Sequence, residues 1–166
     1  MAAQPKTLDD LFLNTLKDIY YAEKKILKAL PKMAKAAQSE QVSAAFLKHQ
    51  EETEGQIDRL GQVFEMLGKP ARGKTCDAIE GIIAEGEEII EEFEDSPALD
   101  AGLVAAAQAV EHYEISRYGT LKAWAGQLGM NEAVKLFDTT LKEEKKTDEL
   151  LSGLGEKLAN EQAAAE

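Results

Sequence analysis

Residues 110–121, VEHYEISRYGTL, are the part of the sequence that decides the fold. Glu111 and Glu114 interrupt a stripe of apolar residues that recurs every three or four positions, which is the period of an α-helix. Because side chains three residues apart share a helix face, both carboxylates are expected to point inward with the stripe. The stretch therefore predicts a helix, ending near Gly129, with acidic groups on its buried face.

The same period recurs in three further stretches and predicts an all-α fold. The first stretch is the most clearly bounded, because Thr7 and Asp10 have the spacing of a capping box. Gly68 ends the second helix, and the fourth runs to Leu158, with a frayed tail expected from Ala159. The expected N-caps of the four main helices are, in chain order, Thr7, Ser39, Ser96 and Asn131.

A long connection, residues 69–97, separates the second and third helices. Between Cys76 and Phe93 apolar residues recur on one face, which predicts an additional helix about 27 Å long at ~1.5 Å per residue. A short turn joins the first helix to the second, and another joins the third to the fourth, so the helices of each pair are antiparallel neighbours. The long connection instead returns the chain to the end of the bundle at which the second helix began, so the second and third helices are parallel. We therefore expect one domain, residues 1–166, with a ferritin-like up-down-down-up four-helix bundle and an extra helix in its crossover.

Charge and composition narrow the class of function. The 166 residues include 31 acidic and 19 basic ones, a formal net charge of −12. That balance argues against nucleic acid and membrane surfaces as partners, because both require a basic footprint. No apolar run approaches the ~18 residues of a membrane-spanning helix, and the N-terminal sequence lacks the apolar region of a signal peptide. A single cysteine, Cys76, cannot form an internal disulfide, so we expect a cytoplasmic protein.

Acidic residues interrupt the apolar stripe of every main helix near its middle. Glu23, for example, stands between Ile19 and Ile26, where the pattern favours leucine. Burying an unpaired carboxylate is costly, so either raised pKa values keep some of these groups protonated or cations lie among them. Oxygen ligands with an imidazole nearby suit Fe or Mn better than zinc–thiolate chemistry. The inward acids are Glu23, Glu52, Glu111, Glu114, Glu144 and Asp148, with His49 and Gln56 close by.

A weak internal duplication leaves the ligands of the second helix open. In one register a spacing of 29 or 30 residues relates the acids of each half, which makes Glu52 a ligand. In another register a spacing of 33 residues relates Glu23 to Gln56 and recurs in the second half of the chain. Three roles are open for His49: a metal ligand, a hydrogen-bond partner of a ligand, or a neutral core histidine that donates to a carbonyl. The choice among His49, Glu52 and Gln56 therefore stays open.

Five blocks of the sequence are similar to a known family: YYAEKKILKALPKMA, FLKHQEETEGQIDRL, CDAIEGIIAE, VEHYEISRYGTL and LKEEKKTDELL. They resemble the YciE/YciF stress-protein family of ferritin-like, rubrerythrin-related bundles over residues 8–158. The resemblance implies a homodimer made in stress responses, with a dinuclear iron-type centre of two Fe or Mn ions per chain. It marks the same six acids, with His49 and Gln56 beside them.

The expected function is redox protection, in which the centre oxidises Fe(II) or reduces O2 or peroxide. Rubrerythrins, however, have Glu-x-x-His on the second and fourth helices, where this chain has Gly55 and Thr147. The cysteine-rich electron-transfer module of rubrerythrins is also absent from the sequence. These departures favour the alternative, a non-catalytic structural or interaction protein in which the metal is stabilising or incidental.

Overall fold

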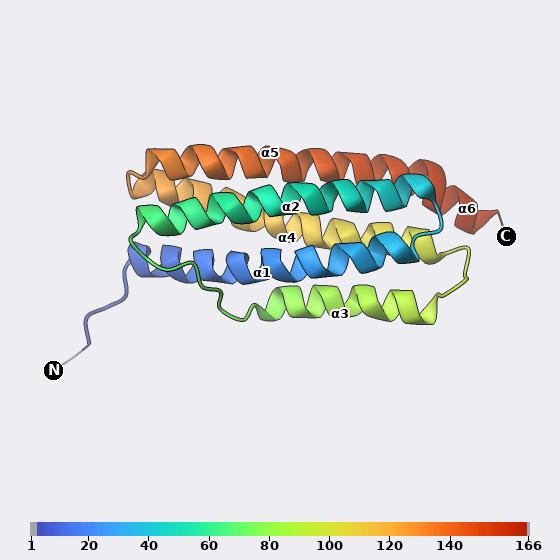
Figure 1. Ribbon diagram of the computed structural model, residues 1–166, viewed down its shortest axis with the longest axis horizontal. Helices are drawn as coiled ribbons and strands as arrows, with labels where there is room; N and C mark the ends of the chain where they lie inside the picture. The colour runs from blue at the N-terminus through green and yellow to red at the C-terminus, as the bar shows by residue number, and fades with distance from the viewer. Residues whose placement is uncertain (1–2, 166) are drawn as a thin grey trace.

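The computed structural model describes residues 3–165, and this part of the chain is helical without any strand (Figure 1). The elements are, in chain order, α1 (Leu8–Ala36), α2 (Glu40–Met66), α3 (Asp77–Glu92), α4 (Leu99–Gln127), α5 (Asn131–Leu154), the π-helical turn η1 (Gly155–Ala159) and α6 (Asn160–Ala164). The predicted all-α class is confirmed. Residues 1–2 and 166 of the predicted domain lie outside the described residues.

Four long helices, α1, α2, α4 and α5, form the bundle, and α3 lies in the crossover between α2 and α4. Figure 1 shows α1 and α5 running in one direction and α2 and α4 in the other. The short turns join α1 to α2 and α4 to α5, and α3 packs along α1 and α4. The up-down-down-up order with a helix in the long connection is therefore as predicted.

Polar side chains fix the starts of the first two helices. Thr7 accepts a hydrogen bond from the Asp10 N–H, and the Asp10 carboxylate accepts one from the Thr7 N–H at 2.8 Å, which completes the predicted capping box. Ser39 caps α2. The buried carboxylate of Asp100, on α4, accepts from the backbone N–H groups of Gln38 and Ser39 at 2.8 and 2.7 Å. One side chain thus ties the α1–α2 turn to the start of α4.

Two other helix starts differ from the prediction. α4 begins at Leu99, because Ser96 Oγ accepts from the Ala98 N–H at 3.1 Å inside a turn instead of capping the helix. α5 follows Met130, so that Asn131 is its first residue rather than its N-cap. Both differences are short shifts along the chain that leave the helix faces unchanged.

The C-terminal segment is helical where fraying was predicted. η1 and α6 continue the helix from α5 to Ala164. Ala159 is buried, and η1 packs against α4 and α5. Apolar contact with the bundle therefore holds this segment in place.

The crossover passes close to α1 before α3 begins. The Lys74 N–H donates to the Lys17 carbonyl at 3.1 Å. A Cβ at Gly73 would lie 2.9 Å from the Tyr21 Cβ, so this approach requires glycine. Cys76 then caps α3, and the predicted helix between residues 76 and 93 is confirmed.

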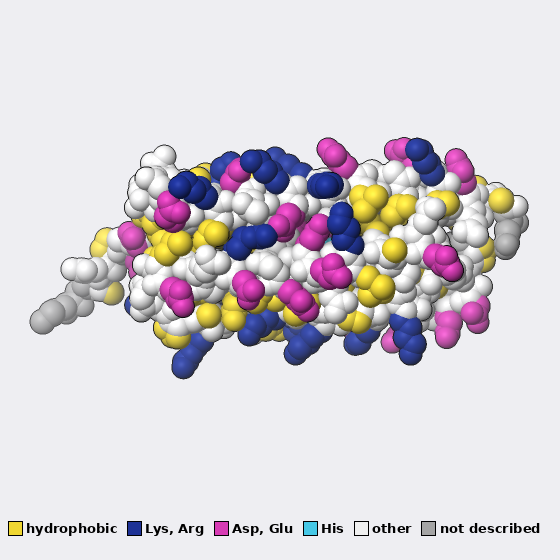
Figure 2. Space-filling view, turned by 45° about the horizontal axis from the view of Figure 1, so that its top comes forward, with side chains coloured by type: hydrophobic (Ala, Val, Ile, Leu, Met, Phe, Trp, Pro, Cys, Tyr) yellow, Lys and Arg dark blue, Asp and Glu magenta, His cyan; other side chains and the backbone are white. Residues whose placement is uncertain are grey.

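The core is apolar toward both ends of the bundle, with Leu30, Phe46 and Leu103 buried at one end and aromatic pairs at the other, and it is polar in its middle. The rings of Phe12 and Phe137 meet edge to face at 6.1 Å, and those of Tyr20 and Phe64 at 5.4 Å. On the surface, Figure 2 shows acidic and basic side chains mixed over one face, with small apolar patches between them. No helix of the described chain has the length and apolarity needed to cross a membrane.

Candidate metal centre

Six polar side chains meet inside the bundle, and every main helix contributes at least one of them. On α4, Glu111 and Glu114 lie one turn apart. On α2, His49 and Gln56 lie two turns apart on the stripe that continues through Leu60. All six side chains are at most 2% exposed. We call this set the central cluster: Glu23, His49, Gln56, Glu111, Glu114 and Glu144.

His49 lies between the carboxylates of α4 and α5. Its Nδ1 is 2.9 Å from Glu111 Oε1, and its Nε2 is 3.7 Å from Glu114 Oε2 and 3.8 Å from Glu144 Oε2. Each of these four residues offers one ligand atom, and the four atoms lie within 4.8 Å of one another. Such a group of one imidazole and three carboxylates is a suitable donor set for a divalent metal ion.

The polar atoms of the central cluster are largely unsatisfied. Although His49 Nδ1 lies near Glu111, the contact lacks the alignment of a hydrogen bond. Nine buried atoms have no hydrogen-bond partner within residues 3–165, and we call them the open ligand atoms. They are Oε2 of Glu23, both ring nitrogens of His49, Oε1 of Gln56, both carboxylate oxygens of Glu111 and Glu114, and Oε2 of Glu144.

Basic side chains do not neutralise these acids. In the described part of the chain, no lysine or arginine forms an ion pair with any of the four glutamates of the central cluster. A buried carboxylate with neither hydrogen bond nor counter-charge is strongly unfavourable. The donor set therefore fits a metal ion, which would satisfy the open ligand atoms and supply the positive charge.

Burial changes the protonation of the cluster. It raises the pKa of Glu23 to about 8 and the pKa values of Glu111 and Glu114 well above their usual range, and neighbouring carboxylates raise the latter two further. Burial also lowers the pKa of the His49 imidazole. Without a cation these groups are driven toward their neutral forms. Because a cation favours ionised carboxylates, metal binding is expected to release protons.

Two of the predicted ligands, Glu52 and Asp148, lie outside the central cluster. The Glu52 side chain is 22% exposed and accepts a hydrogen bond from Thr147 Oγ1 at 3.0 Å. The Asp148 side chain is 21% exposed and lies 3.1 Å from His112 Nε2. The structure thus brings together Glu23, His49, Gln56, Glu111, Glu114 and Glu144, and it places the other two at seams between helices.

Helix rotation explains the position of Glu52. Each residue turns the helix by about 100°, so Glu52 points roughly 60° away from His49, toward α5. Gln56, seven residues from His49, returns to nearly the same direction. Among the two registers of the internal duplication, the one with a spacing of 33 residues relates residues that meet in the cluster.

Two further residues that the apolar stripes do not mark lie beside the cluster, Glu143 in direct contact with it and Arg59 through Glu143. Glu143 accepts a hydrogen bond from Gln56 Nε2 at 3.1 Å, and Arg59 pairs with Glu143. Arg59 follows Gln56 by three residues and Glu143 precedes Glu144, so their spacing placed them beside the cluster. Tyr118, in contrast, was recognisable from the apolar stripe of α4, and its hydroxyl donates to Glu23 Oε1 at 2.6 Å.

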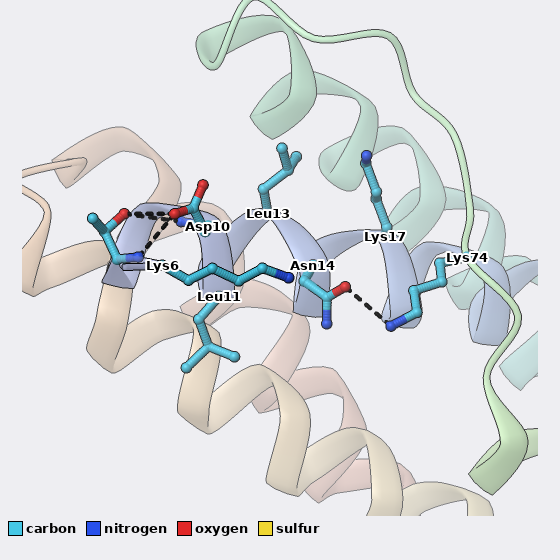
Figure 3. Close-up of a pocket in the computed structure, with 8 residues that line it drawn as sticks. Lys6, Asp10, Leu11, Leu13, Asn14, Lys17 and Lys74 are labelled. Atoms are coloured by element: carbon cyan, nitrogen blue, oxygen red, sulfur yellow. Dashed lines mark hydrogen bonds between the residues drawn. The ribbon is translucent and has the colours of Figure 1, made fainter. Parts of the chain in front are cut away.

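A pocket at the start of α1 is separate from this centre. It has a volume of about 620 Å³, and three lysines line it (Figure 3). Lys74 Nζ donates to Asn14 Oδ1 at 3.0 Å. The pocket is lined by residues between Lys6 and Lys17 together with Lys74, and none of them belongs to the central cluster.

Comparisons with known proteins agree with the fold and the sequence blocks. Residues 7–164 match the family described as a domain of unknown function, DUF892. Protein YciF of Escherichia coli (strain K12) is 47% identical over 159 residues, which cover 95% of this chain and 96% of that protein.

Two solved structures are similar over nearly the whole chain. The crystal structure of the E. coli stress protein YciF has a TM-score of 0.88 and 45% identity, covering 98% of this chain and 100% of that one. YcfI of Rhodopseudomonas palustris, described as a candidate structural protein, has a TM-score of 0.87 and 49% identity, covering 92% and 97%. The predicted resemblance is confirmed: the chain belongs to the DUF892 family of YciF-type stress proteins.

Proposed function

We propose that this protein binds two iron-type cations, Fe or Mn, in the central cluster and uses them in redox protection during stress. The observation that carries the proposal is the set of nine open ligand atoms, all buried and none paired with a lysine or arginine of residues 3–165. Four glutamates supply four negative charges, which two divalent ions balance. Oxygen donors with one imidazole favour Fe or Mn.

The donors divide naturally between two ions. His49, Glu111, Glu114 and Glu144 form the group whose ligand atoms lie within 4.8 Å. Glu23 and Gln56 supply the remaining open ligand atoms. Four-helix bundles of the ferritin-like kind build dinuclear centres in this way, from inward carboxylates on all four helices.

The chain's own residues exclude water and hold protons. Bound iron would supply electrons to O2 or peroxide while Fe(II) is oxidised. Because every ligand side chain is at most 2% exposed, only a small oxidant fits the proposal. Tyr118 holds a proton on Oη, 2.6 Å from Glu23 Oε1, where it stabilises that carboxylate and orients it. We further propose, from the family resemblance, a cytoplasmic homodimer.

Anaerobic titration with Fe(II), followed by metal analysis and absorbance after addition of O2 or peroxide, tests this proposal. We expect about two ions per chain, as in other dinuclear bundles, and an oxidation that depends on them. Glu111→Ala should abolish that stoichiometry, whereas Glu52→Gln, a change at a carboxylate outside the cluster, should preserve it. Absence of specific binding to the wild-type protein would contradict the proposal.

A second candidate function is structural. The description of the R. palustris relative favours it, as does the single imidazole in the central cluster. In this case the ions stabilise the bundle, and a partner or a second copy binds its surface. Stress protection in a deletion strain separates the two functions, because the redox function requires Glu111 and Glu144 whereas the structural function tolerates their replacement by glutamine.

A further inference from the structure

The amide of Gln56 has a defined orientation inside the bundle. Gln56 is fully buried, and its Nε2 donates to the Glu144 carboxylate and, at 3.1 Å, to Glu143 Oε2. A carboxylate accepts hydrogen bonds and repels a carbonyl oxygen, so the amide nitrogen is the end that faces α5. The carbonyl oxygen Oε1 is consequently directed away from these two acids, and it is one of the open ligand atoms.

Arg59 holds the more exposed of these two acids in place. Its Nη2 is 2.5 Å from Glu143 Oε1, and its Nη1 is 3.0 Å from Glu143 Oε2. Such a paired contact between guanidinium and carboxylate restricts orientation more than a single bond does. Nη1 also donates to Thr140 Oγ1 at 3.0 Å, which anchors the guanidinium to α5. Glu143 Oε2 therefore receives hydrogen bonds from Arg59 and Gln56 together.

The chain Arg59–Glu143–Gln56 reaches from the helix seam into the cluster. The Arg59 and Glu143 side chains are 22% and 24% exposed, whereas Gln56 is fully buried. Hydrogen-bond partners outside a metal site commonly orient the ligands inside it, and losing them weakens metal binding. No similar chain faces the His49 side, where both ring nitrogens are open within the described residues.

We propose that Arg59 and Glu143 are positioning residues that hold Gln56 as a neutral oxygen ligand for the second of the two cations. The inference rests on the metal centre proposed above. The two cation positions are then unequal. The group around His49 combines an imidazole with three carboxylates and fills first, whereas the second ion depends on Glu23 and on the oriented amide of Gln56.

Titration of the full-length, metal-free protein with Mn²⁺ tests the inference, by calorimetry and by electron paramagnetic resonance. In the wild type we expect two binding steps, with the signal of an isolated ion giving way to that of a coupled pair. Glu143→Ala and Arg59→Met should each weaken the second step by about 10- to 100-fold and leave the first step unchanged. Gln56→Met should weaken the second step at least as much, with a smaller loss in the first step because it also removes the hydrogen bond to Glu144. The isolated-ion signal should then persist after addition of a second equivalent.

Two further variants make the test specific. Glu143→Gln keeps an oxygen acceptor for Gln56 and Arg59 and should restore much of the second step. Asp138→Ala removes a matched ion pair, because Asp138 of α5 pairs with Lys122 of α4 at 2.7 Å without contacting the cluster. This control should bind both ions as the wild type does. Thermal unfolding of each metal-free variant measures any general loss of stability.

The outcomes distinguish this inference from the proposed function. Unchanged second-ion binding in Glu143→Ala or Gln56→Met overturns the positioning role, and so does an equal loss of both steps. A wild-type protein that binds one ion only also overturns it, while the candidate metal centre itself remains. If the wild type binds no ion, the proposed function fails together with the inference.

Discussion

Two sets of carboxylates lie in the middle of the bundle and differ in what faces them. The inner set belongs to the central cluster and consists of Glu23, Glu111, Glu114 and Glu144. The outer set lies at the seams between helices and consists of Glu52, Glu143 and Asp148. Each outer acid contacts a donor on another helix, and these donors are, in the same order, Thr147, Arg59 and His112.

The comparison separates acids that join helices from acids that face neither lysine nor arginine within residues 3–165. An outer carboxylate keeps part of its hydration and has a partner, so it contributes modestly to stability. An inner carboxylate has lost its hydration, and no lysine or arginine of residues 3–165 pairs with it. Neutralising substitutions in the two sets should therefore change the free energy of unfolding by different amounts and, in the metal-free protein, in opposite directions.

Removing metal should have the largest effect on the stability of the folded protein. An ion that binds only the folded protein stabilises it by about 4 kcal/mol when its concentration is a thousandfold above Kd. For a chain of this size that corresponds to a decrease of roughly 8–16 °C in Tm on chelation. Differential scanning calorimetry with and without a chelator measures it. Glu111→Ala should show no such decrease, and an equal decrease in that variant would place the ion elsewhere.

The second largest effect should be the pH dependence of the stability of the metal-free protein. The pKa of Glu23 is raised from 4.5 to about 8, and those of Glu111 and Glu114 are raised as well. Between pH 4.5 and about 8 the folded state then binds more protons than the unfolded state. The contribution of these groups to the free energy of unfolding is therefore greatest below pH 4.5 and falls as the pH rises toward 8.

Urea unfolding at several pH values, in the presence of a chelator, checks this dependence. We expect a loss of at least about 1.4 kcal/mol between pH 5 and 8, the equivalent of one pKa unit on one group. Saturating metal should remove the loss, because binding strengthens as the carboxylates ionise. Stability that rises with pH in the metal-free protein would show that the inner acids are satisfied in another way.

Paired neutralising substitutions should show the opposite signs directly. In metal-free protein at pH 8, Glu111→Gln should stabilise by about 1 kcal/mol, because it removes a buried carboxyl group that must either carry an unpaired charge or hold a proton far above its usual pKa. Glu52→Gln should destabilise by up to about 1 kcal/mol, because it weakens the bond to Thr147 and the pair with Lys48. Chemical denaturation of both variants provides the measurement. The same sign in both would erase the distinction between the two sets.

The smallest effect is expected at Asp148. Its partner His112 has a side chain that is 69% exposed, and such ion pairs contribute about 0–1 kcal/mol. Asp148→Asn should therefore shift the unfolding midpoint slightly and leave Mn²⁺ binding unchanged. Reduced metal binding in this variant would move Asp148 from the outer set to the inner one.

The sequence predicts the helices and the inward acids of α1 and α4 well, because those acids interrupt long apolar stripes. It does not resolve the choice between Glu52 and Gln56, since both lie within about 60° of His49 and the rotation of α2 depends on its packing against α1 and α5. The same limit applies to Glu144 and Asp148 on α5. Arg59 and Glu143 look like ordinary surface charges in the sequence. Helix spacing already puts Arg59 one turn from Gln56, but only the folded seam brings Glu143 to both of them.

The buried carboxylate of Asp100 has a consequence for assembly of the bundle. The bundle consists of two helical hairpins, α1 with α2 and α4 with α5. Docking one hairpin against the other demands the correct longitudinal alignment, and a slip of one helical turn would separate Glu23 from Glu114 by about 5 Å. By accepting the Gln38 and Ser39 N–H groups, Asp100 favours one alignment at this end of the bundle, and this alignment brings the residues of the central cluster to the same height.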